Sequence, residues 1–198
     1  AQESRGLGDV YKRQNISFDT TQKVANSYVS ADYGVGHFTN FEHLVEVSIT
    51  ATSGNDSGVV FWSVANQANQ TYQDISSLGH GIAVYWLSYN SRLTLNDFGG
   101  GAGDYHTESS PFTFFLTVSN NSTTGVCRLY TDAARTDLHD TLTVTTEGIA
   151  HQYLSCSGSR DAAGTDTVTG YVANLDLQEG GATTVSYTHL TLPTTPYV

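Results

Sequence analysis

Most of the chain alternates between apolar and polar residues with a period of two, which restricts the folds open to it. Within residues 43–51, Val45, Val47 and Ile49 fall on one face and mostly polar side chains fall on the other. Residues 112–118 alternate in the same way. Successive side chains of a strand point to opposite sides, so this period is typical of a strand with one buried face. The chain is therefore predicted to consist mainly of β-strands.

Two segments, residues 58–64 and 82–89, are apolar on both faces, which predicts central strands and places Trp62 and Trp86 in the core. Segments rich in Gly, Asn, Asp and Ser separate the strands and favour turns. We find no helical stripe of useful length, and only a single turn is expected at residues 132–135. About ten short strands at this spacing predict one antiparallel β-sandwich. The further strands are expected at residues 92–95, 126–130, 141–145, 152–157 and 167–177.

Both ends of the chain differ in character from its centre. Residues 4–14 and 185–194 resemble in-frame translations of the oligonucleotide adapters that a transposase attaches to DNA fragments before sequencing. We therefore expect residues 1–14 and 185–198 to be non-biological tails, to be excluded from fold and function. Residues 15–184 are then a single domain cut from a longer parent protein, and a mixed environmental sample is the expected source.

Charge narrows the choice of partners. The chain has 19 acidic residues against 8 Lys and Arg, a net charge of −11. Such a surface repels phosphate backbones and anionic lipid, so we expect neither nucleic acid nor a membrane as a partner. An acidic, lysine-poor domain rich in Thr, Ser and Asn fits an extracellular or virion-surface protein.

The two cysteines, Cys127 and Cys156, are not at a metal-binding spacing. Strand parity puts Cys127 on the same face as Leu129, and Cys156 on the same face as Leu154, so both thiols are predicted to be buried. Two interpretations stay open, a disulfide in an extracellular protein or two buried free thiols. A disulfide requires the two strands to be neighbours.

Several segments together resemble a known family of β-sandwiches. They are residues 114–118, 126–132 and 170–177 (GYVANLDL), preceded by residues 32–38 and 41–43. The pattern resembles the concanavalin A-like jelly roll of lectins and glucanases, and more narrowly the laminin-G-like modules of environmental and phage-associated sequences. This resemblance implies a concanavalin A-like fold, with carbohydrate recognition in some members and a purely architectural role in others.

A sugar site requires exposed aromatic rings and nearby polar groups. Asp97, Asp104, Tyr105 and His106 surround the glycine-rich run at residues 99–103 and are the candidate ligand-binding residues. The competing interpretation of this segment is a simple connection between strands.

The resemblance to glucanases implies a second function class, a glycoside hydrolase. Its two carboxylates would be Glu42 and Glu46, which point to the same side of one strand. Leu44 stands where the glucanase pattern has an aspartate, and four strand residues span ~13 Å, well above the ~5–9.5 Å between carboxyl groups of a hydrolase pair. The sequence therefore favours a non-catalytic module.

Metal binding is a third class. The resemblance implies that Ca²⁺ is an expected cofactor of some members, and Asp97, Asp104 and Glu108 are its candidate ligands here. These residues lack the spacing of an EF-hand. The histidines are scattered without a ligand motif, so each is expected to be solvated or hydrogen-bonded. The combined prediction is a non-catalytic surface module that binds a glycan or has an architectural role, within a longer parent protein.

Overall fold

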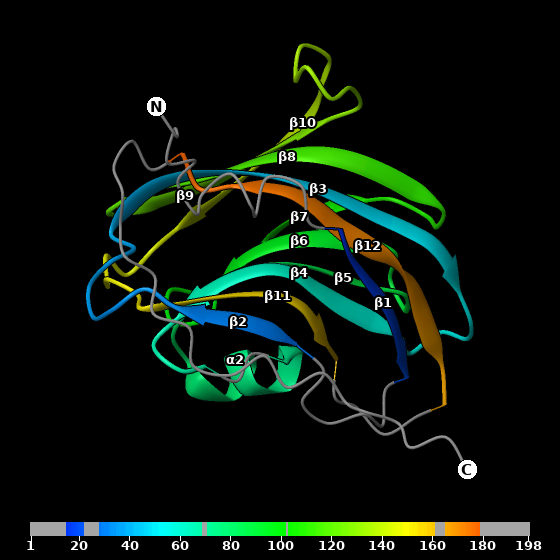
Figure 1. The fold of residues 1–198 in the computed structure, drawn as a ribbon, viewed down its shortest axis with the longest axis horizontal. Coiled ribbons are helices and arrows are strands. Elements are labelled where there is room, and N and C mark those ends of the chain that lie inside the picture. The colour runs from blue at the N-terminus through cyan, green and yellow to red at the C-terminus, as the bar shows by residue number, and fades with distance from the viewer. Residues whose placement is uncertain (1–14, 22–27, 69–70, 102, 161–164, 179–198) are drawn as a thin grey trace, which may run out of the picture.

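The computed structural model describes residues 15–21, 28–68, 71–101, 103–160 and 165–178. Two antiparallel sheets of six strands face each other (Figure 1). The β3 sheet has the strand order β1-β12-β3-β8-β9-β10, and the β4 sheet has the order β2-β11-β4-β5-β6-β7. The strands are β1 Ile16–Thr21, β2 Val29–Asp32, β3 Asn40–Thr52, β4 Gly58–Ala65, β5 Ile82–Leu87, β6 Arg92–Asp97, β7 Asp104–Thr107, β8 Phe112–Asn121, β9 Thr124–Tyr130, β10 Leu138–Thr145, β11 Tyr153–Ser159 and β12 Thr167–Asp176.

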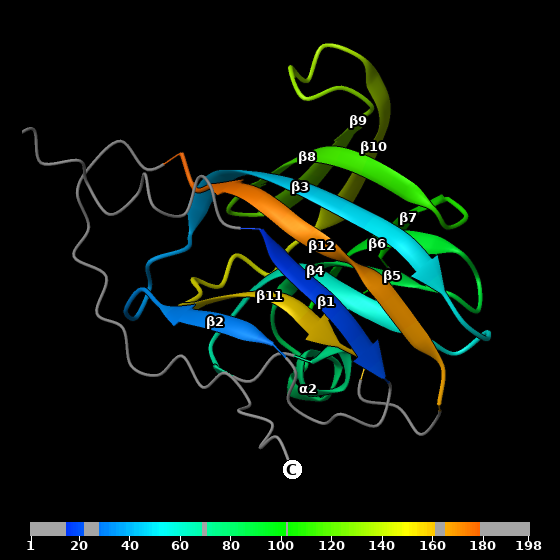
Figure 2. The same ribbon diagram turned by 45° about the vertical axis from the view of Figure 1, so that its right-hand side comes forward.

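The strand order is that of a jelly roll, because strands from the two ends of the domain interleave. β1 and β3 both pair with β12, while β2 and β4 both pair with β11. Figure 2 shows β1 alongside β12 at one edge of the β3 sheet. The predicted antiparallel β-sandwich is confirmed. The predicted tails, residues 1–14 and 185–198, lie outside the described residues, so the division into one domain and two tails stays a prediction.

The core lies between the two sheets and is lined by the alternating apolar side chains. Val45, Val47 and Ile49 of β3 are fully buried there, as their period of two predicts. Both tryptophans, Trp62 and Trp86, also lie in this core, which confirms their predicted burial.

One short helix was not predicted from the sequence. It is α2, Tyr72–Leu78, and Figure 1 shows it beneath the β4 sheet. Its Ile75 packs with Val60 and Tyr85 on the outer face of that sheet. The outward side chains of β4 and β5 are therefore covered, which explains why these two strands are apolar on both faces.

Local capping explains why α2 forms without a long apolar stripe. The Thr71 hydroxyl accepts a hydrogen bond from the Asp74 N–H, and the Asp74 carboxylate accepts one from the Thr71 N–H, which is a capping box. Gly79 ends the helix with a φ of 66°, a conformation that glycine adopts without strain. The sequence features that indicate this helix are the residues that cap its two ends, rather than a periodic apolar stripe.

The two cysteines are free thiols. Both are buried, as strand parity predicted. Cys127 lies on β9 of the β3 sheet and Cys156 on β11 of the β4 sheet, so their strands are not neighbours. The disulfide interpretation is therefore wrong for this structure. Burial raises the pKa of both thiols, to about 12 for Cys156, which keeps them protonated and unreactive.

Gly170 of β12 lies in close contact with the backbone of its neighbour β3. A Cβ atom built on this residue would lie 2.0 Å from the backbone oxygen of Ser48 and 2.8 Å from the ring of Phe18. Replacement Gly170→Ala forces β3 and β12 apart, and we expect it to lower the free energy of unfolding by about 1–3 kcal/mol. Urea unfolding measures this change. Gly125→Ala is the matched control, because a Cβ there would meet side-chain methyl groups at 3.1 and 3.2 Å rather than a backbone atom at 2.0 Å, and it is expected to cost less. Equal losses in both variants would contradict the close approach.

Candidate functional site

Three of the four residues predicted to bind a ligand lie on one edge strand rather than in a loop. Asp104, Tyr105 and His106 belong to β7, which pairs with β6 at the end of the β4 sheet. Alternation along β7 sends them to different sides. Tyr105 stands opposite Thr94 on the outer face, whereas Asp104 and His106 point toward β10 of the other sheet. The predicted set is therefore split between two surfaces.

The two aspartates of the predicted set, Asp97 and Asp104, both accept hydrogen bonds from backbone N–H groups. Asp97 is 4% exposed, and its carboxylate accepts hydrogen bonds from the N–H groups of Gly99 (3.0 Å) and Glu147 (2.9 Å). Asp104 accepts a hydrogen bond from the Thr143 N–H at 2.9 Å, which ties β7 to β10 across the gap between the sheets. These contacts give both carboxylates a structural role, and neither presents an unused oxygen toward the exposed ring of Tyr105.

Tyr105 is the predicted residue that remains open to solvent, with 45% of its surface exposed. The guanidinium of Arg92 lies 3.7 Å from the centre of its ring. Tyr89, which is 57% exposed, lies in the turn before β6 and has Arg160 at 5.3 Å from its ring centre. We call these four residues the tyrosine edge: Tyr89, Arg92, Tyr105 and Arg160.

The arginines of the tyrosine edge are held in place by their neighbours. Arg160 donates a hydrogen bond to the backbone oxygen of Asp56 at 3.0 Å and forms an ion pair with its carboxylate. Arg92 is stacked on Tyr105, and such cation–π contacts contribute about 0.5–1 kcal/mol at exposed sites. Each exposed tyrosine ring of the tyrosine edge therefore has an arginine side chain next to it.

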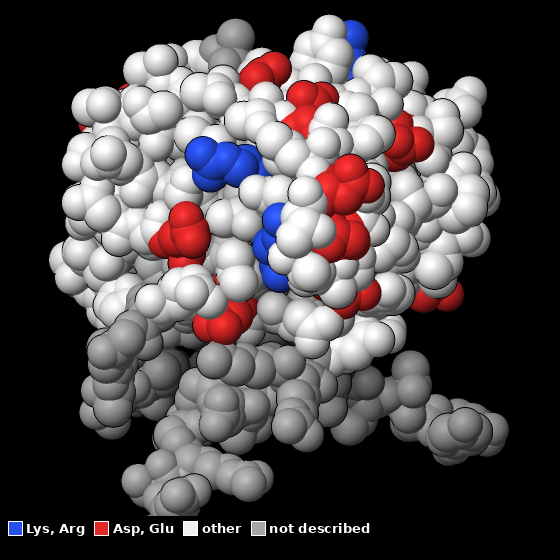
Figure 3. All heavy atoms as spheres, turned by 90° about the horizontal axis from the view of Figure 1, so that it is seen from above, with Lys and Arg blue, Asp and Glu red and all other residues white. Residues whose placement is uncertain are grey.

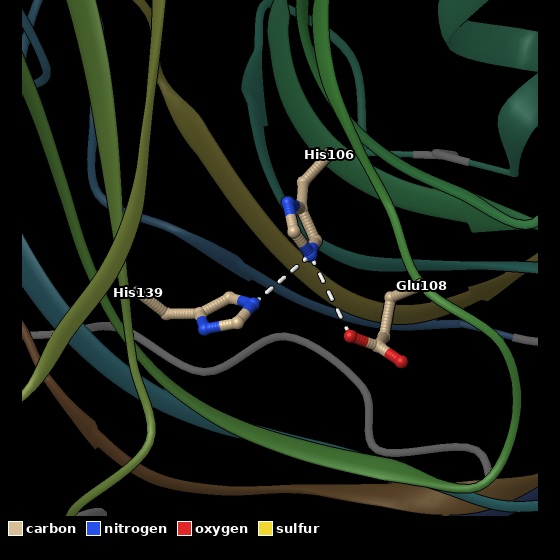
Figure 4. Close-up of side chains that lie close together, drawn as sticks. All are labelled: His106, Glu108 and His139. Carbon is tan, nitrogen blue, oxygen red and sulfur yellow. Dashed lines mark hydrogen bonds and ion pairs between the residues drawn. The ribbon is translucent and has the colours of Figure 1, made fainter.

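The inward side of β7 forms a second group of polar residues. His106 Nδ1 lies 2.7 Å from the Asp140 carboxylate, and His106 Nε2 lies 3.3 Å from His139 Nε2 and 3.5 Å from the Glu108 carboxylate. Figure 4 shows the rings of His106 and His139 and the carboxylate of Glu108 pointing toward one another. We call these four residues the histidine cluster: His106, Glu108, His139 and Asp140.

The fold builds the histidine cluster where the edges of the two sheets meet. His106 and Glu108 come from β7 and the residues after it, and His139 and Asp140 come from β10. His139 is the extra residue of a β-bulge, because Leu138 and Asp140 pair with consecutive residues of β9. A bulge re-aims its side chain, and here the ring of His139 turns toward His106. The spacing of the histidines in the sequence did not predict that His106 and His139 would lie in contact.

An apolar side chain closes one side of the histidine cluster. Phe114 of β8 is buried, and its ring centre lies 5.4 Å from that of His139 and 5.9 Å from that of His106. Partial burial raises the pKa of Asp140, but hydrogen bonds from His106 and from the Thr141 N–H outweigh it, so this pKa is lowered overall. Asp140 is therefore a carboxylate at neutral pH, paired with His106.

The three residues predicted to bind Ca²⁺ do not converge. The oxygens of Asp97 and Asp104 accept separate backbone hydrogen bonds, and Glu108 faces His106. Among the described residues, His106, Glu108 and His139 form the group of three whose potential metal ligands lie within 4.8 Å of one another. This arrangement does not support a calcium site made by Asp97, Asp104 and Glu108.

The carboxylates proposed for hydrolysis lie on the outer face of the β3 sheet. Glu46 accepts hydrogen bonds from the Tyr171 hydroxyl (2.9 Å) and the Asn174 amide (2.6 Å), so both its oxygens are engaged. Glu42 is exposed four residues away along the same strand, a span of ~13 Å. Figure 3 looks down on this side of the molecule and shows acidic side chains with basic ones among them. Glu42 and Glu46 do not form a catalytic pair in this structure.

Two shallow depressions lie elsewhere on the surface. One, of about 450 Å³, is bordered by β1, β3 and β12, and includes Asp19 and Tyr171. The other, of about 430 Å³, is bordered by β3 and the start of β8, and includes Ser48 and Pro111. Neither contains a residue of the tyrosine edge or of the histidine cluster.

No protein-family model matches the sequence, and no curated protein has a significantly similar sequence. Similar solved structures include the lumenal domain of VIP36 bound to Ca²⁺ and Man3GlcNAc, at 11% identity and a TM-score of 0.47 over 89% of this chain and 87% of that one. Domains LG4-5 of the mouse laminin alpha1 chain give 9% identity and 0.47 over 89% and 45%. The CBM2 module of the evolved Dit of Lactobacillus casei BL23 phage J-1 gives 10% and 0.41 over 82% and 77%. Similarity at this level assigns no ligand to this chain.

Proposed function

We propose that the domain is a non-catalytic glycan-binding module and that the tyrosine edge is its binding surface. The observation that carries this proposal is the pair of exposed tyrosines, Tyr89 and Tyr105, each with an arginine against its ring. Most large apolar side chains of the described residues are buried, so two half-exposed rings next to one hairpin stand out.

The chemistry of the tyrosine edge matches that of a sugar. The face of a sugar ring carries C–H groups that stack on an aromatic face, and its rim carries hydroxyls that hydrogen-bond to polar side chains. Tyr89 and Tyr105 supply the aromatic faces. Arg92 and Arg160 supply N–H donors in a fixed planar arrangement.

The overall charge indicates which glycans are suitable. With a net charge of −11, the chain repels a polyanionic polysaccharide, and two arginines compensate only locally. The proposed ligand is therefore a neutral glycan of a cell surface or extracellular polysaccharide. In keeping with this ligand, we propose an extracellular or virion-surface location, within a longer parent protein. No described helix has the length and hydropathy needed to cross a membrane.

A glycan array tests the proposal, with isothermal titration of the glycans that bind. Tyr105→Ala removes a stacking surface and is expected to weaken binding at least tenfold, or about 1.4 kcal/mol. Tyr105→Phe keeps the ring and is expected to retain most of the affinity. Val35→Ala, at a residue that is 92% exposed and outside the tyrosine edge, is the matched surface control.

Other outcomes of the same experiment separate the function classes. No bound glycan would support a purely architectural domain instead. Release of sugar from a bound glycan, lost in Glu46→Gln, would support the hydrolase and overturn the non-catalytic proposal. Binding that survives Tyr105→Ala and Tyr89→Ala would place the ligand on another surface.

A further inference from the structure

The separations between atoms in the histidine cluster match those around a tetrahedral metal ion. Zinc binds histidine nitrogen at about 2.0–2.1 Å, and two such ligands at a tetrahedral angle lie about 3.3–3.4 Å apart. In the structure, the Nε2 atoms of His106 and His139 are 3.3 Å apart, and the Glu108 carboxylate lies 3.5 Å from His106 Nε2. Two of the three separations are therefore close to those of a tetrahedral zinc site, and all three potential ligand atoms lie within 4.8 Å of one another.

A second contact prepares His106 for this role. Its Nδ1 lies 2.7 Å from Asp140, whose charged carboxylate accepts the Nδ1–H. The hydrogen bond fixes the tautomer and turns the lone pair of Nε2 toward His139 and Glu108. A carboxylate behind a histidine ligand is a common feature of zinc sites and raises the basicity of the ring. Asp140 is itself held by the Thr141 N–H at 2.7 Å.

The surroundings also fit a built site. Phe114 packs against both imidazoles and shields one side of the cluster. The side chain of His106 is 17% exposed and that of Glu108 is 31% exposed, so an ion can enter from the open side. The β-bulge at His139 is the backbone feature that brings the second imidazole into place.

We propose that the domain binds one Zn²⁺ ion through His106 Nε2, His139 Nε2 and the Glu108 carboxylate, with Asp140 as the positioning residue behind His106. In the metal-free chain, one Nε2 proton forms the hydrogen bond between the two rings. Zn²⁺ binding requires the Nδ1–H tautomer of His139, so this proton moves from Nε2 to Nδ1 by exchange with solvent, and both Nε2 atoms then offer a lone pair while each ring stays neutral. The fourth position is left for a water molecule or a ligand atom. This site lies on the opposite side of β7 from the tyrosine edge and does not depend on the proposed glycan binding.

Titration of the full chain with Zn²⁺, expressed without a histidine tag, tests the site by calorimetry against a competing chelator. Wild type is expected to bind one ion per chain. His139→Asn removes an exposed ligand and is expected to lower the affinity at least tenfold. Asp140→Asn keeps a hydrogen-bond acceptor but not the charge, and is expected to lower it about 10–100-fold. His80→Asn is the matched control, because His80 pairs with Glu147 at 2.9 Å but belongs to no group of three potential metal ligands among the described residues.

Two further measurements make the outcome decisive. Thermal melting without metal shows whether each variant folds, and added Zn²⁺ is expected to raise the midpoint of wild type and of His80→Asn more than that of His139→Asn. Ca²⁺ is expected not to compete, because it prefers oxygen ligands. No saturable Zn²⁺ binding by wild type, or equal affinity in wild type and His139→Asn, would overturn the site.

Discussion

Lowering the pH from 6.5 to 4 is expected to reduce the free energy of unfolding by about 3 kcal/mol through His43 alone. His43 is fully buried on β3 among Phe38, Phe41 and Trp62. Its Nδ1 accepts a hydrogen bond from Trp62 Nε1 at 3.1 Å, so its proton is on Nε2, which has no hydrogen-bond partner. A second proton would place an unsolvated charge in the core.

The sign of this effect follows from the direction of the pKa shift. Burial lowers the pKa of His43 to about 3, with nearby His37 lowering it further and Asp176 acting in the opposite sense. Between that value and the ordinary pKa near 6.5, the unfolded chain takes up a proton that the folded chain does not. The stabilisation is therefore complete above pH 6.5 and is lost as the pH falls toward 3. Burial also lowers the pKa of His151, which adds a loss of the same sign.

Urea unfolding at pH 7, 6, 5 and 4 measures this linkage. His43→Asn offers Trp62 an oxygen acceptor near the position of Nδ1 and cannot be protonated, so its stability should fall less steeply below pH 6.5. The difference in slope is about 1.4 kcal/mol per pH unit. His80→Asn, at a histidine whose side chain is 56% exposed, should change the slope much less than His43→Asn does. The same slope in wild type and His43→Asn would show that His43 is not kept neutral by burial.

Trp62→Ala is expected to lower the free energy of unfolding by about 3–5 kcal/mol. Trp62 is fully buried in the central strand β4, where its ring contacts the rings of Phe41 and His43. The substitution opens a cavity between the sheets, and it also removes the hydrogen-bond donor to His43 Nδ1. Since natural domains are stable by only about 5–15 kcal/mol, this single change removes a large part of the total.

A smaller substitution separates packing from hydrogen bonding. Trp62→Phe keeps most of the ring volume but leaves His43 Nδ1 without its donor, at a cost of about 1–3 kcal/mol. Tyr89→Ala, at an exposed ring, is expected to change stability by less than about 0.5 kcal/mol. Urea unfolding of the three variants gives the order. A loss below about 1 kcal/mol for Trp62→Ala would contradict its place in the core.

The sandwich could be predicted because its strands bury one face, and alternation reports burial directly. The apolar runs of β4 and β5 predicted central strands for the same reason. Their outward burial by α2 could not be foreseen, because a seven-residue helix with only Ile75 buried leaves no periodic trace. β7 was missed because Asp104–Thr107 is a short edge strand after a glycine-rich run, where turn signals dominate.

The candidate site shows more clearly where sequence reasoning ends. Tyr105 and His106 were both selected, but nothing in the sequence says that Tyr105 faces solvent while His106 faces another sheet. The contact between His106 and His139 depends on which sheet edges meet and on a one-residue bulge in β10. Both are properties of the assembled fold. Asp97 was predicted to bind a ligand because of its place beside the glycine-rich run. An aspartate in such a place can instead accept hydrogen bonds from the backbone of the turn, which is the role of Asp97 here.

The glycan-binding proposal is tested most directly by following backbone amide signals in NMR spectra while a neutral glycan that binds on the array is added to the full chain. The proposal predicts saturable shifts concentrated at Tyr89, Arg92 and Tyr105, with the amides of β3 around Glu42 and Glu46 unchanged. Shifts confined to the outer face of the β3 sheet would contradict the tyrosine edge as the binding surface. The absence of saturable shifts with any glycan would contradict glycan binding itself.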